Sequence, residues 1–117
     1  MKSNIQTRKL ISALHKAGKE VKLWKRIAIE LEKSTRSMAA VNISKLDKVV
    51  RDNEIALVPG KVLSVGQVSK PLTVAALHFS EAAAKKINAK GKALSIEELL
   101  KSNPKGNKVR IIKWKRT

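Results

Sequence analysis

The sequence predicts an α/β fold, in which a mixed body of strands and helices follows an N-terminal pair of helices. Three observations support this fold class. Apolar residues near the N-terminus recur at three- and four-residue spacing, which is typical of amphipathic helices. Further along, short runs rich in valine and isoleucine alternate with helical patterns, the order expected of α/β or α+β domains. Hydrophobic residues make up 43% of the 117 positions, which is enough to build one core.

Two helices come first in the predicted order. Residues 4–17 form the first, with Leu14 on its apolar stripe and Gly18 placed to end it. Residues 21–33 form the second, whose apolar stripe includes Trp24 while its lysines point elsewhere. The connecting AGKE allows either a helical hairpin or a helix-turn-helix, so both arrangements stay open.

The middle of the chain alternates between extended and turning segments. After a polar break at residues 34–38, a short strand is expected at residues 41–44, where apolar and polar side chains alternate. Residues 46–52 suit one helical turn, and residues 54–63 are expected to be extended. Pro59 lacks a backbone N–H, which favours an edge or a bend at this point, and the glycine after it permits a β-bulge.

The second half contains the most apolar stretch of the chain. Residues 71–79, PLTVAALHF, predict a central strand that is buried on both faces. Ser80 is placed to cap a helix over residues 81–90, and Gly91 is placed to end it. The KALS segment that follows is interpreted as a short strand.

A second capped helix and a last strand complete the predicted order. Ser95 and Glu98 make an S-x-x-E capping box, which opens a helix that runs to about Ser102. The PKGN sequence beyond it is typical of a turn. Residues 108–114, KVRIIKW, predict a final strand whose cations face a partner, and strict alternation places Ile112 on that charged face.

The chain shows no linker, internal repeat or low-complexity stretch. We therefore predict a single domain over residues 1–117, with a helical part at 1–35 and an α/β body with a basic C-terminal end at 36–117. The absence of cysteine excludes disulfides and thiolate metal sites. The lack of an apolar run of about 18 residues, and of a signal-peptide core, predicts a cytoplasmic protein without a membrane partner.

Charge is the strongest compositional signal. Lysine and arginine total 26 against 9 aspartate and glutamate residues, which is a formal net charge of +17. Both halves of the chain are basic, so the charge is spread over the whole body and should attract a polyanion such as nucleic acid. Aromatic residues are only 3% of the chain, which argues against a binding sheet built on stacked aromatic rings.

The glycine-containing stretch VPGKVLSVGQVSK looks like a phosphate-binding loop, but its spacing is wrong. A Walker A loop needs lysine and serine or threonine directly after its second glycine, whereas Gly66 is followed by Gln67 and Val68. His78 and Ser80 lack the G-x-S-x-G context of a hydrolase, and no metal-binding motif is present. We therefore predict that the chain is not an enzyme and has no cofactor, metal or small-molecule substrate.

The side chains predicted to bind nucleic acid are lysines and arginines on the second helix, at turns and in the basic C-terminal end. They are Lys22, Lys25, Arg26, Arg36, Lys61, Lys70, Lys105, Lys108, Arg110, Lys113, Lys115 and Arg116. Helix-turn-helix proteins read bases with polar side chains, whereas these cations suit phosphates. A large folded RNA, recognised by its shape and backbone, is therefore preferred. A free-standing helix-turn-helix DNA-binding protein that uses residues 4–33 is the alternative.

Several segments resemble one known family, both in sequence and in their order along the chain. They are VNISKL, VPGKVLSVGQVSKPLTVAALHFSEAAAKKI and SIEELLKSNPKGNKVRII. They resemble the archaeal and eukaryotic large-subunit ribosomal protein called L eighteen-e, a relative of the bacterial ribosomal protein L fifteen. The resemblance is dense from about Arg36 to Ile112, and the chain is similar to the short archaeal form.

This resemblance implies a structural constituent of the large ribosomal subunit, with an α/β body, N-terminal helices and no catalysis. The implied partners are large-subunit ribosomal RNA and neighbouring ribosomal proteins, and no homo-oligomer is expected. On this interpretation Pro59, Gly60 and Gly66 shape the backbone rather than hold a nucleotide. Lys61 and Lys70 flank them as phosphate contacts.

Overall fold

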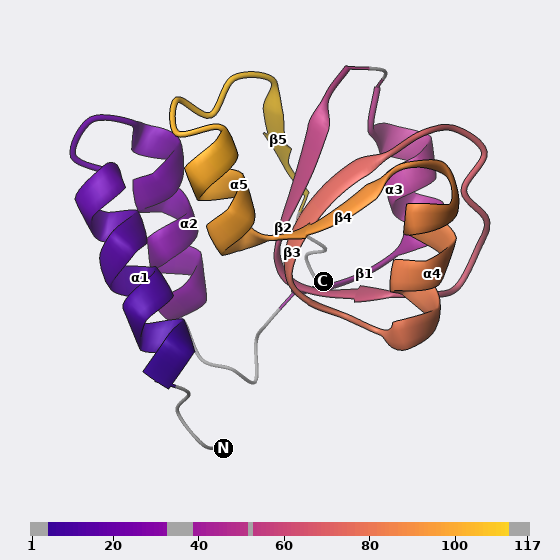
Figure 1. Ribbon diagram of the computed structural model, residues 1–117, viewed down its shortest axis with the longest axis horizontal. Coiled ribbons are helices and arrows are strands. Elements are labelled where there is room, and N and C mark those ends of the chain that lie inside the picture. The colour runs from indigo at the N-terminus through magenta and orange to yellow at the C-terminus, as the bar shows by residue number, and fades with distance from the viewer. Residues whose placement is uncertain (1–4, 33–38, 52, 113–117) are drawn as a thin grey trace, which may run out of the picture.

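The computed structural model describes residues 5–32, 39–51 and 53–112. The elements in chain order are α1 (Ile5–Ala17), α2 (Lys22–Glu32), β1 (Ala39–Asn42), α3 (Ile43–Val49), β2 (Ile55–Leu63), β3 (Thr73–Phe79), α4 (Glu81–Lys90), β4 (Lys92–Ser95), α5 (Ile96–Ser102) and β5 (Val109–Ile111). The strands form one parallel sheet between two layers of helices (Figure 1). Helices α1, α2 and α5 cover one face, and α3 and α4 cover the other. The predicted α/β fold with an N-terminal pair of helices is therefore confirmed.

The sheet is organised around β2. On one side β2 pairs with β3, which pairs in turn with β4. The other side of β2 is shared, because Ile55–Leu57 pair with β5 and Gly60–Leu63 pair with β1. All pairs are parallel, so the strands begin at one edge of the sheet and end at the opposite edge.

These two edges recur below under fixed names. The strand-start edge comprises the first turn of α2, the segment before β2 (Arg51, Asn53 and Glu54) and residues 103–108. The strand-end edge comprises residues 64–66 after β2 and the starts of α4 and α5, at residues 80–83 and 95–98.

Two hydrophobic cores hold the layers together. The first core lies between the sheet and α3 and α4, and the second lies between the sheet and α1, α2 and α5. Successive residues of a strand point to opposite faces, so Ala56 and Val58 enter the first core while Leu57 enters the second. On β3, Ala75 enters the second core and its neighbours on both sides enter the first. The prediction that residues 71–79 contain a central strand buried on both faces is therefore confirmed.

Local signals place most helix ends where the sequence predicts them. The Ser80 hydroxyl accepts the N–H of Ala83 at 3.2 Å, and Ser95 and Glu98 form both bonds of the capping box. Gly18 follows the last residue of α1 and packs so closely on α2 that a Cβ there would lie 2.7 Å from the Cβ of Lys25. α1 and α2 lie side by side as a helical hairpin (Figure 1).

The prediction for residues 41–52 was partly wrong. The strand expected at residues 41–44 ends at Asn42, and the single helical turn expected at residues 46–52 is instead helix α3 over Ile43–Val49. Alternation of apolar and polar residues suggested a strand, but Ile43 and Leu46 lie three apart and bury together in the first core as one helix face.

Pro59 does not lie on an edge strand, contrary to one of the two options that the sequence left open. β2 is bonded on both sides along its length. The ladder between β2 and β3 shifts between Val58 and Lys61, so a β-bulge absorbs the missing N–H of the proline.

The last strand is shorter than predicted, and one residue faces the other way. Only Val109–Ile111 of the predicted 108–114 belong to the sheet, and residues 113–117 lie outside the described part of the chain. Ile112 does not share a charged face, because its N–H donates to the Leu57 carbonyl (2.9 Å) and its side chain is buried in the first core. The strand has ended by then, so strict alternation no longer applies.

Candidate nucleic-acid interface

Most acidic side chains that the structure describes bond to groups of the protein itself. Glu54 accepts the backbone N–H of Arg51 at 2.9 Å and pairs with the Arg110 guanidinium at 3.4 Å. Asp47 accepts the backbone N–H and the hydroxyl of Ser69, at 3.0 and 2.7 Å. Further contacts join Glu32 to His15, Glu97 to Lys101 and Glu98 to Ser95. These carboxylates fasten the fold, which leaves little negative charge to neutralise the cations.

Two of these carboxylates have pKa values below their ordinary range. The backbone N–H and hydroxyl of Ser69 lower the pKa of Asp47, and the charges of Lys70 and Lys90 lower it further. The same two kinds of bond from Ser95 lower the pKa of Glu98. Hydrogen bonds to a carboxylate favour its ionised form, so both groups stay charged in mildly acidic solution.

Many of the basic side chains have no comparable bond. Within the described residues, no hydrogen bond or ion pair is formed by the side chains of Lys22, Lys25, Arg26, Lys61, Lys70, Lys105 or Lys108. All but Lys70 are exposed, and Lys70 is partly exposed. Their positive charges are therefore available to a partner.

The direction of the helices sorts charge between the two edges of the sheet. α3, α4 and α5 each follow a strand directly and run back, so each begins at the strand-end edge and finishes at the strand-start edge (Figure 1). A helix dipole favours acids at its N-terminus and bases at its C-terminus. The acids in first turns are Glu81, Glu97 and Glu98, and the bases in last turns are Lys48, Lys90 and Lys101. The strand-start edge thereby gains positive charge and the strand-end edge gains negative charge.

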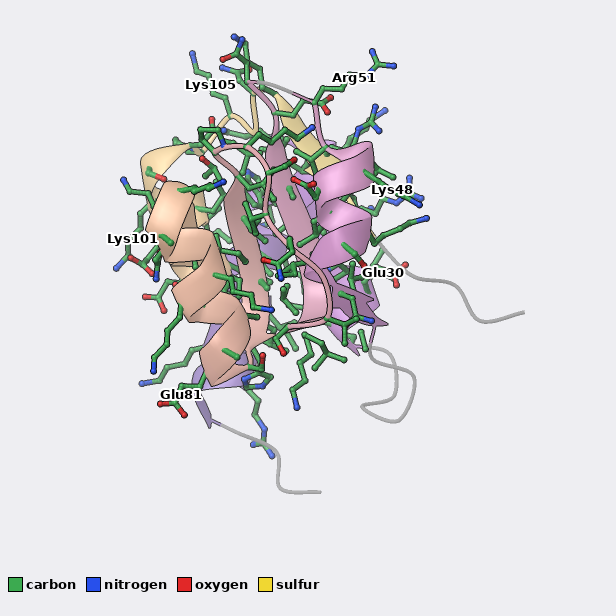
Figure 2. All side chains as sticks on the ribbon, turned by 90° about the vertical axis from the view of Figure 1, so that its right-hand side faces the viewer. Glu30, Lys48, Arg51, Glu81, Lys101 and Lys105 are labelled. Carbon is green, nitrogen blue, oxygen red and sulfur yellow. The ribbon has the colours of Figure 1, made fainter. Side chains whose placement is uncertain are left out.

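Four exposed cations from distant parts of the sequence meet at the strand-start edge. They are Lys22, Arg51, Lys105 and Lys108. The N–H of Ile55 donates to the Lys108 carbonyl at 2.8 Å, which sets the start of β5 beside the segment that contains Arg51. Figure 2 shows Arg51 and Lys105 projecting from the same end of the molecule.

The turn that carries Lys105 is held against α2. The indole Nε1 of Trp24, which is fully buried, donates to the Pro104 carbonyl at 2.7 Å. Gly106 has a positive φ of 68° and approaches so closely that a Cβ would lie 2.5 Å from Cδ2 of Leu23. Asn103 closes the turn with two hydrogen bonds to the backbone of Asn107. Lys105 is therefore presented on a rigid turn beside the start of α2.

At the strand-end edge, the segment after β2 is tied down by side chains from both helices of that face. The Lys86 ammonium donates to the Ser64 and Gly66 carbonyls at 3.0 and 3.1 Å. Gly66 has a φ of 111°, and a Cβ there would lie 2.4 Å from the Cβ of Ser44. Gly66 therefore shapes the backbone, as the sequence interpretation expected, and the Lys86 charge serves the loop rather than a partner.

The predicted site residues do not form one patch. Lys22, Lys105 and Lys108 lie together at the strand-start edge, whereas Lys61 lies on the sheet between β1 and β3. Lys25 and Arg26 lie on the exposed side of α2, and Lys70 lies in the loop before β3 near Asp47. Arg36, Lys113, Lys115 and Arg116 lie outside the described residues.

Arg110 has partners that its sequence position did not suggest. Besides the ion pair with Glu54, its guanidinium donates to the Val49 carbonyl at the end of α3, at 3.3 Å. A cation at this position satisfies an open carbonyl at a helix C-terminus. Arg110 thus joins β5 to α3, whatever else it contacts.

Sequence reasoning missed Arg51. It lies in an irregular segment with no neighbouring lysine or arginine, so no local charge run marks it. The signal that could have found it is the parallel sheet, because the segments before two paired parallel strands must meet at one edge. Recognising that residues 55–57 pair with residues 109–111 would have placed Arg51 near Lys108.

The described part of the chain contains no helix long and apolar enough to cross a bilayer. It also contains no group of three or more histidine, aspartate or glutamate side chains placed to hold a metal ion. The observed surface is dominated by unpaired cations on a rigid frame, which is the form expected of a phosphate-binding protein.

Comparison with known proteins assigns a family. A sequence profile for the ribosomal proteins 50S-L15 and 50S-L18e and their 60S counterpart matches residues 19–94. A protein of Methanosphaerula palustris named large ribosomal subunit protein eL18 is 48% identical over 115 residues, which is 96% of this chain and 95% of the relative. The protein of the same name from Archaeoglobus fulgidus is 49% identical over 114 residues, 95% of this chain and 97% of the relative. The chain therefore belongs to this family of ribosomal proteins.

Proposed function

We propose that the protein is a structural constituent of the large ribosomal subunit and binds large-subunit ribosomal RNA through phosphate contacts, chiefly at the strand-start edge. Neighbouring ribosomal proteins are its other partners, and it acts as a single copy. The relatives carry the name of a large-subunit protein, and membership of a ribosomal family agrees with the cytoplasmic location that the sequence predicts. A ribosomal structural protein has no catalytic role, which agrees with the predicted absence of enzyme chemistry.

One observation supports the RNA-binding surface above the others: acids are consumed internally while cations are left without partners. The carboxylate of Glu54 lies at the strand-start edge, but Arg110 and the Arg51 N–H already occupy it. Lys105 and Lys108 therefore have no carboxylate partner in the described residues. Each such cation can neutralise one phosphate and release condensed counterions, which makes binding strongly dependent on salt.

The helix-turn-helix alternative is not favoured. α2 buries Trp24, Ile27, Ala28 and Leu31 in the second core, and its first turn is held by residues 104–106. A recognition helix must project its side chains into a DNA groove. Because α2 covers the sheet beside α1 and α5, it serves chiefly as part of the core.

Salt titration with two matched double variants tests the surface. K105Q/K108Q removes two charges from the strand-start edge, and K9Q/K85Q removes two exposed charges from α1 and α4. Binding to deproteinised archaeal large-subunit ribosomal RNA is measured at several salt concentrations. For K105Q/K108Q we expect the slope of log affinity against log salt to shrink by about 2, or about one per lost phosphate contact. K9Q/K85Q should stay close to the wild type.

Two outcomes would overturn the proposal at different levels. A wild-type affinity that hardly changes with salt would rule out binding by phosphate contacts. Equal losses in the two variants would mean that charge is read diffusely over the whole surface and that the strand-start edge has no special role.

A further inference from the structure

A row of three exposed side chains crosses the sheet on neighbouring strands. Lys61 of β2 is flanked in register by Ala40 of β1 and His78 of β3, and all three are exposed. The next residues along, Val62 and Phe79, face the first core. Strands lie about 4.8 Å apart, so the row is about 10 Å wide and stands on a rigid hydrogen-bonded ladder.

The β-bulge decides which side chains stand in this row. Val58 pairs with Ala76, so an unbroken ladder would set Lys61 opposite Phe79. The bulge at residues 59–60 adds one residue to β2 and sets Lys61 opposite His78 instead. An ammonium group and an imidazole ring are thereby placed side by side. This gives the VPGK sequence a consequence that backbone shaping alone does not explain.

Neither polar side chain of the row is used by the fold. Within the described residues, Lys61 and His78 form no hydrogen bond or ion pair, whereas the other histidine, His15, pairs with Glu32. The indole of Trp24 is fully buried. In the described part of the chain, His78 is therefore the exposed ring that remains available to stack on a ligand.

A hollow adjoins the row on its β1 side. It has a volume of about 530 Å³ and is lined by Ala40, Asn42, Ser44, Lys45 and Lys48. Ala40 belongs to both the row and the hollow, and its small side chain leaves the passage between them open. Cations therefore occur both in the row and in the hollow, so an extended polyanion would meet positive charge along this path.

We propose that the row formed by Ala40, Lys61 and His78 binds an unpaired nucleotide of RNA. Lys61 contacts a phosphate, the His78 ring stacks on the base, and the chain continues past Ala40 toward the hollow. Exposed imidazole rings stack on unpaired bases in RNA complexes, and a lysine beside the ring supplies charge for the backbone. The proposal rests on the proposed function and adds a base-dependent contact to a surface that otherwise reads phosphates alone.

Two single-stranded probes separate base stacking from charge. One is a short oligoadenylate, and the other is an abasic oligoribonucleotide with the same number of phosphates. We expect the full-length wild-type protein to bind the oligoadenylate about fivefold more tightly, because stacking one base on an aromatic ring contributes roughly 1–3 kcal/mol. Fluorescence anisotropy at low salt measures both affinities.

Variants at the two polar positions assign the roles. H78Q should abolish the preference for the base-bearing probe, and H78F, which keeps a flat ring, should restore it. K61Q should weaken binding to both probes equally and reduce the salt slope by about 1. K85Q, on the exposed side of α4, is the matched control and should change neither quantity.

The results also separate this inference from the proposed function. If H78Q keeps the full base preference, or if the wild type shows none, no base stacks at the row. Preferential binding of polyglutamate over both probes would assign the row to an acidic protein segment instead. In each case the effect of K105Q/K108Q on ribosomal RNA binding still tests the strand-start edge by itself.

Discussion

The strand-start and strand-end edges of one sheet are built from similar short segments, yet they differ in charge and in what their charges do. At the strand-end edge, Glu98 closes a capping box and Lys86 holds the Ser64 and Gly66 carbonyls. At the strand-start edge, Lys105 and Lys108 make no such bonds within the described residues. Charges at the strand-end edge largely stabilise the fold, whereas cations at the strand-start edge are left for a partner.

The difference teaches that an ordinary rule of helix stability can polarise a whole molecule. Parallel strands force the intervening helices to run in one direction, and each helix prefers acids at its start and bases at its end. The basic edge therefore arises partly as a consequence of stabilising three helices. A nucleic-acid surface of this kind needs no sequence motif, which explains why the chain carries none.

The largest expected effect breaks the strand-start edge at its anchor. W24A should lower the free energy of unfolding by about 3–5 kcal/mol, because it empties a fully buried site in the second core. W24F keeps most of the volume but leaves the Pro104 carbonyl without its donor, a loss of about 1–3 kcal/mol. Urea denaturation measures both values.

RNA binding distinguishes the anchor from the core. W24F should weaken ribosomal RNA binding, because the turn that carries Lys105 loses its fixed position. I27V, which trims the same core without touching that turn, should cost about 0.5–1.5 kcal/mol of stability and leave RNA binding unchanged. Equal RNA affinity in W24F and I27V would show that the turn needs no anchor.

An intermediate effect is expected from breaking the strand-end edge. G66A should cost about 1–3 kcal/mol, because alanine is strained at a φ of 111° and its Cβ would meet the backbone and side chain of Ser44. S64A, two residues away, leaves the carbonyl that Lys86 uses and should be nearly neutral. Thermal unfolding checks the stability, and ribosomal RNA binding should survive G66A if the two edges act separately.

The smallest effect sharpens the role of acids at the strand-end edge. S95A should cost about 1 kcal/mol through loss of the helix cap. The folded-state pKa of Glu98 lies below its ordinary value of 4.5, so its contribution is present above that pH and is lost as the pH falls through the folded pKa. E98Q keeps a capping-box side chain but cannot titrate, so its stability should fall less between neutral pH and acid. Identical acid profiles for wild type and E98Q would contradict this role.

Much of the fold was predictable because its signals are local. Ser80, Ser95 and Gly18 act on the few residues around them, and the aliphatic run in residues 71–79 has few alternatives to a buried strand. The errors came where a tertiary choice overrode a local one. Ile43 could face the core from a strand or from a helix, and Pro59 is tolerated in an interior strand only because the neighbouring ladder accepts a bulge.

The sequence by itself determined the basic character of this protein, its aliphatic core and the order of most of its elements, because composition, caps and periodicity act within a few residues. Only the tertiary structure decided which cations stand together and which are consumed. Lys22, Arg51 and Lys108 meet because β5 pairs with the start of β2, and Lys61 meets His78 because of one bulge. Strand pairing and register depend on burying both faces of the sheet at once, and that condition involves the whole chain.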